Sequence, residues 1–292
     1  MTHLKKAAAI GAAGVLIGWM ILPGGTSAAT VKVHLTAEEK TLPISADETY
    51  EAWTYNGKVP GPVVRVKQGD QVEFTLENKG ARPHSIDFHA ARINPGVAYR
   101  SIGVGETNSF TWKAEYPGLF AYHCGTSPMI QHVANGMFGV VIVDPQKPMR
   151  PAREYVLVQS EFYPDVPAMM EKRRKHVVFN GRVNQYIEKP LIAKPGELVR
   201  LYIVNIGPNN FSAIHVIGGI FDAVYESGNP ANAVRGVQTW TIPPAGGAIF
   251  ELTFPEEGSY PIVTHSLSDA LSGAIGVIKV SKDADGKTEL VP

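Results

Sequence analysis

Most of the chain consists of short apolar runs in which β-branched residues alternate with polar residues or follow one another directly. Gly, Pro and Asn interrupt these runs, which is typical of β-strands joined by turns. A helical pattern is present only in residues 167–175 and, less clearly, in residues 268–272. Many closely spaced strands predict an all-β protein built from sandwiches or barrels. The predicted strands include PVVRV, QVEFTLEN, SFTWKA, FGVVIVD, ELVRLYIVN, AIFELTF and IGVIKV.

The strands occur in two similar sets. The segment YNGKVPGPVVRVKQGDQVEFTLEN, which ends at Asn78, resembles FNGRVNQYIEKPLIAKPGELVRLYIVN, which ends at Asn205. A repeat of about 125–140 residues is much longer than a solenoid unit and therefore predicts a duplicated domain. Three prolines mark a linker in residues 144–153. We expect a first domain over residues 30–146, a second over 147–282 and a tail over 283–292.

The N-terminus has the pattern of an export signal over residues 1–29. Lys5 and Lys6 precede the apolar run AAAIGAAGVLIGWMIL and a stretch of small residues. This run is short for a membrane span, which needs about 20 apolar residues. We expect cleavage near Ala28 or Ala29, with an uncleaved membrane anchor as the alternative. Both place the domains outside the cytoplasm, in the periplasm or on the outer face of the cytoplasmic membrane.

The charge balance argues against a polyanionic partner. Lys plus Arg and Asp plus Glu number 27 each. Without a basic excess, we expect no nucleic-acid partner.

The only cysteine is Cys124, in the segment AYHCGTSPMIQHVANGMFG, residues 121–139. His123 precedes it directly, and His132 follows in the same segment. A lone thiol is unusual in an exported protein, where cysteines are usually paired. Binding to a metal would explain why this thiol stays unpaired.

The spacing of the histidines predicts two separate metal centres. Successive side chains of a strand point to opposite faces. His84 and His89 are five residues apart, and His123 is adjacent to Cys124. In regular strands, His84 and Cys124 can therefore share one face while His89 and His123 share the other. The two centres would be joined by a single peptide bond.

The first set gains two further candidates, His132 and Met137. Two imidazoles, one thiolate and a weak thioether are typical of blue copper. A single cysteine argues against a structural zinc site with four thiolates. Met129 is a competing thioether, and we favour Met137 because it lies at the start of the strand FGVVIVD.

The second set, His89 and His123, needs a third ligand, for which His265 in the second unit is the best candidate. Asp87 lies two residues before His89 and shares its face in a regular strand. A carboxylate beside an open metal position can donate a proton. An ordinary edge carboxylate is the alternative interpretation of Asp87. His215, in the segment AIHVIG of the second unit, is a further candidate. A core histidine is the alternative interpretation of His215.

The combination of HSIDFH, YHC followed by H-x4-M, HVIGGIFDAVY and the final THSL resembles the copper-containing nitrite reductases, a family of two-domain cupredoxins. The resemblance extends from about residue 35 to residue 282 and implies two tandem cupredoxin-like Greek-key domains of the β-sandwich or barrel type, with one or two short helices. Seven residues separate Cys124 from His132, which identifies a short-loop variant of the family. One type 1 and one type 2 copper per subunit are implied. The type 1 ligands would be His84, Cys124, His132 and Met137; the type 2 ligands would be His89, His123 and His265 of the partner subunit in a homotrimer.

The resemblance also implies a reaction, the one-electron reduction of nitrite to nitric oxide and water in denitrification. Asp87 and His215 would handle the protons. A small copper protein or cytochrome c would supply the electron.

Two other functions compete with this interpretation. A two-domain multicopper oxidase requires H-x-H motifs, which this chain lacks, and a histidine after the cysteine, where this chain has Gly125. A non-enzymatic blue-copper electron carrier requires only the type 1 ligands. It leaves the remaining histidines and Asp87 without a role.

Overall fold

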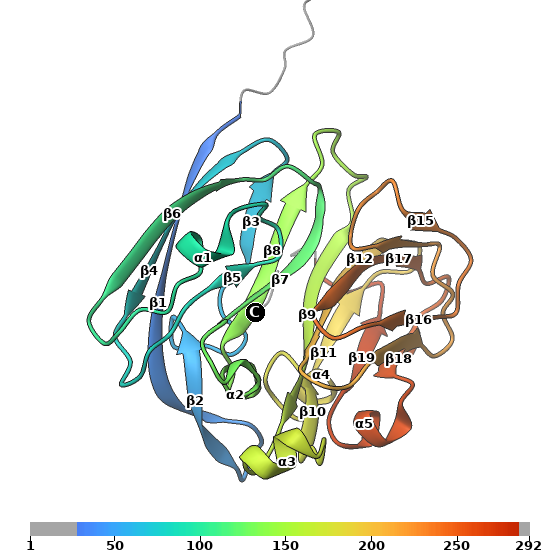
Figure 1. The fold of residues 1–292 in the computed structure, drawn as a ribbon. Coiled ribbons are helices and arrows are strands. Elements are labelled where there is room, and N and C mark those ends of the chain that lie inside the picture. Colours follow the sequence, from blue (N-terminus) through green and yellow to red (C-terminus); the bar gives the residue numbers. More distant parts are fainter. Residues whose placement is uncertain (1–27, 286–292) are drawn as a thin grey trace, which may run out of the picture.

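The computed structural model describes residues 28–285 and consists mainly of strands arranged in four sheets (Figure 1). The all-β prediction is therefore confirmed. Most of the predicted export signal, residues 1–29, and most of the tail, residues 283–292, lie outside the described residues. No helix among residues 28–285 is long and apolar enough to span a bilayer.

Two four-stranded sheets enclose the core of the first half of the chain. Buried and exposed residues alternate along β4, because one face of its sheet packs on the core and the other faces solvent. Phe74 and Trp112 from one sheet share this core with Val66 and Val141 from the other. The first sheet contains β2 (Thr49–Tyr55), β1 (Thr30–Pro43), β4 (Gln71–Asn78) and β6 (Thr107–Lys113); the second contains β3 (Val64–Lys67), β8 (Phe138–Asp144), β7 (Gly118–His123) and β5 (Asp87–Phe88).

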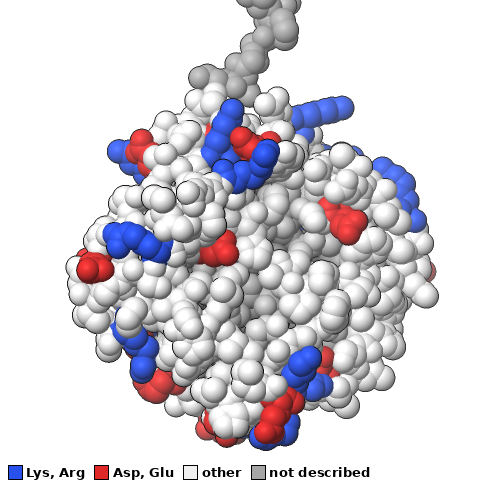
Figure 2. Space-filling model, viewed as in Figure 1, with Lys and Arg blue, Asp and Glu red and all other residues white. Residues whose placement is uncertain are grey.

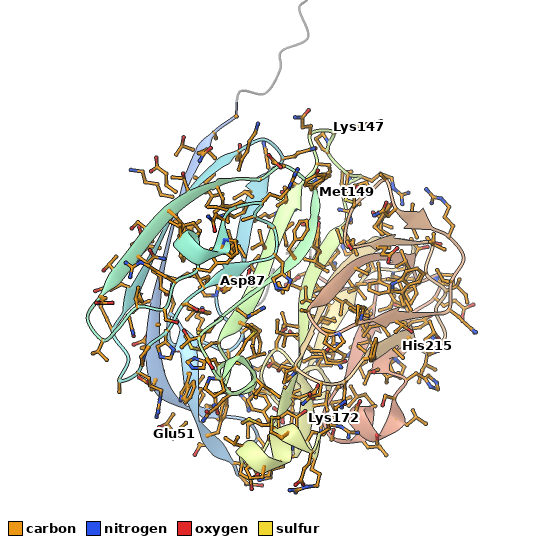
Figure 3. All side chains as sticks on the ribbon, viewed as in Figure 1. Glu51, Asp87, Lys147, Met149, Lys172 and His215 are labelled. Carbon is orange, nitrogen blue, oxygen red and sulfur yellow. The ribbon has the colours of Figure 1, made fainter. Side chains whose placement is uncertain are left out.

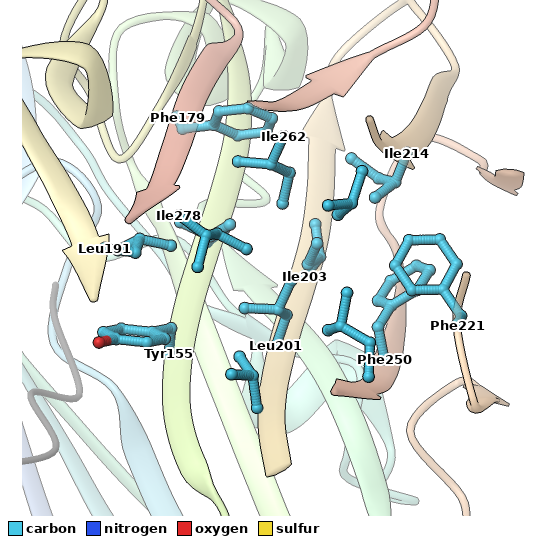
Figure 4. Packing of buried hydrophobic residues seen from close by; sticks show 14 of the residues in the cluster. Tyr155, Phe179, Leu191, Leu201, Ile203, Ile214, Phe221, Phe250, Ile262 and Ile278 are labelled. Carbon is cyan, nitrogen blue, oxygen red and sulfur yellow. The ribbon is translucent and has the colours of Figure 1, made fainter. Parts of the chain in front are cut away.

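The second half of the chain repeats this arrangement with larger sheets. Leu201 and Phe250 from one sheet pack against Ile214 and Ile262 from the other (Figure 4). The six-stranded sheet contains β10 (His176–Phe179), β9 (Arg153–Phe162), β12 (Leu198–Gly207), β17 (Gly246–Thr253), β14 (Ala223–Glu226) and β15 (Ala233–Val234). The five-stranded sheet contains β11 (Lys189–Ala193), β19 (Ile275–Val280), β18 (Gly258–Thr264), β13 (Ser212–Val216) and β16 (Thr239–Ile242).

The described residues contain five short helices, whereas the sequence predicted one or two. Helices of four to six residues are too short to form alone, so tertiary contacts rather than a sequence pattern specify them. Of the two segments with a helical pattern, residues 167–175 are helical only at their start, and residues 268–272 largely coincide with the last helix. The helices are α1 (Pro95–Ala98), α2 (Met129–Ala134), α3 (Val166–Met170), α4 (Gln185–Glu188) and α5 (Leu267–Leu271).

The two halves share an apolar cluster, which explains why the strand FGVVIVD has no polar alternation. Val141 and Val143 face the first core. Phe138 and Ile142, on the opposite face of β8, pack with Val158 and other residues of the second half. Strand β8 is thus buried on both faces, as continuous apolar strands usually are.

A partly buried ion network also connects the two halves. Arg65 of β3 donates hydrogen bonds of 2.8 Å to both Asp144 and Glu154. Arg200 donates to Glu154 and Glu251, each at 2.9 Å. Burial alone would raise the pKa of Glu251, but hydrogen bonds from Arg150 and Arg200 outweigh it and hold this pKa below its usual value. The network therefore keeps a charged carboxylate inside the protein.

Replacing Arg200 with alanine should lower the free energy of unfolding by about 3–5 kcal/mol, because it removes one partner of a buried ion pair. Arg200 is 2% exposed and Glu251 is 1% exposed. Urea unfolding followed by far-UV circular dichroism measures the change. The exposed pair of Lys32 with Glu73 provides a control, since Lys32→Ala should cost at most about 1 kcal/mol. Equal effects of the two substitutions would contradict a stabilising role for the network.

Candidate metal sites

Three separate segments bring His84, Cys124 and His132 together in the first half of the chain. Cys124 follows β7 directly, and His132 lies in α2. His84 lies in the loop after β4, where its backbone exchanges two hydrogen bonds with Ile102. The side chains are almost completely buried, with exposures of 0%, 0% and 4%.

The donor atoms of these three residues converge on one point. Nδ1 of His84 lies 3.3 Å from Nδ1 of His132, and the same atom of His132 lies 3.3 Å from Sγ of Cys124. All three donor atoms lie within 4.8 Å of one another. Two imidazoles and one sulfur form a donor set that suits copper, because the soft sulfur ligand favours it.

The two methionine candidates differ in their surroundings. Met137 is fully buried, and its backbone joins both neighbouring ligands: its carbonyl accepts from the N–H of Cys124, and its N–H donates to the carbonyl of His132. Met129, at the start of α2, is 47% exposed. The burial of Met137 agrees with the preference for it as the fourth ligand.

The imidazoles of this cluster are held in their neutral form. Burial lowers the pKa of His132 to about 4, with further lowering by His84 and Arg82. Burial also lowers the pKa of His84. A neutral imidazole keeps the lone pair that binds a metal.

Ser85 contributes the polar contacts to the sulfur. Its backbone N–H donates to Sγ of Cys124 at 3.3 Å, and its hydroxyl lies 3.8 Å from the same atom. Hydrogen bonds to a sulfur ligand tune the properties of the bound metal. Ser85 was not predicted as a site residue, although its position directly after His84 is a signal in the sequence that could have identified it.

Asp87, His89 and His123 form a second group on the other side of β7. Asp87 pairs with His123 in the β5–β7 ladder, and Nε2 of His89 lies 3.0 Å from Nε2 of His123. The donor atoms of all three residues lie within 4.8 Å of one another. Burial, followed by the neighbouring His123, lowers the pKa of His89, which favours the neutral form. The structure therefore groups these residues as the strand parity argument expected, with His123 and Cys124 in different groups.

His215 and His265 lie together on the second half of the chain, with ring centroids 5.6 Å apart. His215 belongs to β13, and His265 follows β18. Nδ1 of His215 is 2.6 Å from the carbonyl oxygen of Gln238. A carbonyl can only accept, so Nδ1 donates a proton in this contact, while Nε2 does not take part in it. Gln238 carried no sequence signal, because a backbone carbonyl is available at every position.

Neither of these histidines joins the group of His89 and His123 within one subunit. Among the described residues, the donor atoms clustered with His89 and His123 include only those of Asp87. Figure 3 shows Asp87 and His215 apart, on different halves of the molecule. Within one subunit, the described residues therefore bring two imidazoles and one carboxylate to this group.

Comparison with known proteins identifies the family. The chain is 39% identical to the copper-containing nitrite reductase of Neisseria gonorrhoeae, over 86% of this chain and 69% of that protein. It is 33% identical to the Pseudomonas chlororaphis enzyme of the same name, over 87% of this chain and 80% of the relative. The chain belongs to the copper-containing nitrite reductases. The resemblance inferred from HSIDFH, YHC and THSL is therefore confirmed.

The structures of this family share the fold of the chain. A copper nitrite reductase from Nitrosomonas europaea superimposes with a TM-score of 0.86 and 48% identity, covering 89% of this chain and 96% of that one. A multicopper oxidase family model matches residues 36–148. The similarity over most of the chain supports nitrite reductase membership over the multicopper oxidase alternative. Copper is the metal that this family and the donor set in the first half both indicate.

Proposed function

We propose that this chain reduces nitrite to nitric oxide and water, consuming one electron and two protons in each turnover. Membership of the copper-containing nitrite reductases supports the choice of substrate. The observation that carries the proposal is the presence of two donor groups, one on each side of the Cys124–His123 peptide bond. An electron carrier without catalytic activity would need only one of these groups.

The two groups have different tasks. His84, Cys124 and His132, with Met137, would hold the type 1 copper. His89 and His123 would hold the type 2 copper with His265 of the partner subunit. Copper supplies a centre that accepts and passes on one electron at a time, and at the second group it also supplies a position for nitrite. The peptide bond between Cys124 and His123 is the shortest covalent connection between the two groups.

The proton donors would be Asp87 and His215. Asp87 is half-buried, and its carboxylate lies within 4.8 Å of the donor atoms of His89 and His123. The carbonyl of Gln238 orients the ring of His215. Cleavage of an N–O bond of nitrite requires protons on the departing oxygen, and we expect these two side chains to deliver them in an assembled site.

The assembly we propose is a homotrimer. His265 is exposed in the single subunit, and each subunit can offer it to the next in a closed ring of heterologous contacts. The face seen in Figure 2 has few charged side chains at its centre. Depletion of charge is typical of the core of an interface.

The electron donor would be a small copper protein or a cytochrome c. We place the enzyme outside the cytoplasm, in the periplasm or on the outer face of the cytoplasmic membrane, and its reaction in denitrification. The signal pattern of residues 1–29 supports this location.

Anaerobic mixing of the copper-loaded protein with a chemical reductant and nitrite tests the proposal. A nitric oxide electrode should record sustained nitric oxide production. Blue protein that binds copper in both groups and yet forms no nitric oxide would overturn the proposal.

Replacing Asp87 with asparagine should reduce nitrite turnover by about 10²- to 10⁴-fold, the usual contribution of a positioned proton donor. The amide has the same shape as the carboxylate and lacks its transferable proton. Copper content and the blue absorption band should stay at wild-type levels. Asp47→Asn, in an exposed turn, provides the matched control and should leave turnover unchanged. Wild-type turnover by Asp87→Asn would contradict the proton-donor role.

A further inference from the structure

Two buried polar atoms that lack hydrogen bonds face each other beside the first donor group. These atoms are Oε1 of Glu39 and Nε2 of His84, and they lie 3.7 Å apart. Within the described part of the chain, neither has a hydrogen-bond partner. Buried polar atoms are usually satisfied, so a facing pair of this kind calls for an explanation. Nε2 is the ring nitrogen of His84 that points away from Cys124 and His132.

The fold holds the Glu39 carboxylate in this place. Glu39 belongs to β1, and its other carboxylate oxygen accepts a hydrogen bond of 2.9 Å from the backbone N–H of Ala81. Gly80 leaves room for this arrangement. A Cβ at that position would lie 2.8 Å from Oε2 of Glu39 and 3.1 Å from Nε2 of His84. The approach of carboxylate and imidazole therefore depends on glycine at position 80.

A cation and an aromatic ring complete the surroundings of this pair. Nε of Arg82 lies 3.4 Å from Oε1 of Glu39. The guanidinium of Arg82 lies 4.6 Å from the centroid of the Trp53 ring, which packs edge-on against His132. Trp53 is also the cross-strand partner of Glu39. Arg82 thus limits the cost of keeping a carboxylate in this partly buried position, where the Glu39 side chain is 23% exposed.

We propose that Glu39 is a positioning residue that accepts the Nε2 proton of His84 and so fixes the ligand tautomer of that imidazole. With the proton on Nε2, the lone pair of Nδ1 points at the position enclosed by Cys124 and His132. A carboxylate behind a ligating histidine also makes the imidazole a stronger donor. The negative charge of the Glu39 carboxylate would stabilise the oxidised, more positive form of copper and so lower the reduction potential of the copper. This inference rests on the proposed role of His84 as a copper ligand.

Substitution of Glu39 by glutamine tests the role, because the amide oxygen can still accept the proton while the charge is lost. We expect Glu39→Gln to raise the midpoint potential of the blue copper and to keep its colour. Glu39→Ala removes the acceptor as well, so it should raise the potential further and weaken copper binding by about 10- to 100-fold. Spectroscopic redox titration and competition with a copper chelator measure these two quantities.

Glu38→Gln is the matched control, since it makes the same charge change at the next position of β1. Adjacent strand residues point to opposite faces, so this control should leave the potential and the copper affinity unchanged. Wild-type values in both Glu39 variants, or an equal shift in Glu38→Gln, would overturn the proposal. Neither measurement uses nitrite, so a failure of the proposed enzymatic function would be seen separately as absent turnover.

Discussion

Replacement of Cys124 by serine should abolish the blue colour of the copper-loaded protein and reduce donor-driven nitrite reduction to background. The substitution removes the only thiolate from a group in which His84 and His132 supply the other converging donor atoms. A hydroxyl is a poor substitute, because sulfur is the soft ligand that favours copper and gives the blue site its character. Electrons from the donor protein would then have no site of entry.

Copper analysis separates this effect from misfolding. The Cys124→Ser protein should lose copper from one group and keep the copper bound by His89 and His123. Met129→Leu is a suitable control, because this exposed thioether is expected to have no role as a ligand. A Cys124→Ser protein that stays blue would exclude Cys124 as a ligand. Blue colour lost in Met129→Leu would show that the wrong methionine has been assigned.

Two inactive variants, His89→Ala and His265→Ala, should regain activity when their subunits are assembled together. Each variant alone should lack type 2 copper, because every site would lose one imidazole. In a mixed ring, a site is complete when a His265→Ala subunit supplies His89 and His123 and a neighbouring His89→Ala subunit supplies His265. Random mixing in a closed heterologous ring should restore about a quarter of the sites. Co-expression with two affinity tags, followed by copper analysis and turnover measurements, tests this expectation.

The matched control pairs His89→Ala with His123→Ala. Both substitutions affect the same half of the site, so every site in such a mixture lacks one imidazole and no activity should return. Failure of His89→Ala and His265→Ala to complement each other in mixed oligomers would contradict a site shared between subunits. Full type 2 copper content in either single variant would exclude that residue as a ligand.

Much of the fold could be predicted from the sequence because the chain contains two similar sets of strands, which can be compared with each other. Asn78, the last residue of β4, and Asn205, near the end of β12, have equivalent contacts: each side chain donates to backbone carbonyls and accepts from a glycine N–H two residues later. Cys124 and Thr264 also occupy equivalent places in the two halves of the chain. Each donates its backbone N–H to a residue just before the next strand, Met137 and Ala274 respectively.

The grouping of the site residues followed from strand parity. His123, the last residue of β7, and Cys124, the residue after it, belong to different donor groups, in agreement with an alternation that continues past the end of the strand. The roles of individual residues as copper ligands stay predictions that the substitutions above test.

Other features depend on contacts that no local pattern records. Glu39 reaches His84 through the parallel pairing of β1 with β4 and the loop that follows β4. Trp53 comes from β2, far from His132 in sequence. Helix α2 is a short segment that the pattern did not distinguish from a loop, although it carries His132. The continuous apolar run of β8 is explained only by the second half of the chain, which covers the outer face of this strand.

In the proposed reaction, an electron enters at Cys124 and leaves on nitrite bound near His123. The most direct measurement reduces the blue copper under anaerobic conditions, removes excess reductant and then adds nitrite in a stopped-flow instrument. We expect the blue absorption to return and one molecule of nitric oxide to form for each electron that the reduced copper gives up. Blue absorption that stays bleached in the presence of nitrite, with no nitric oxide formed, would contradict it.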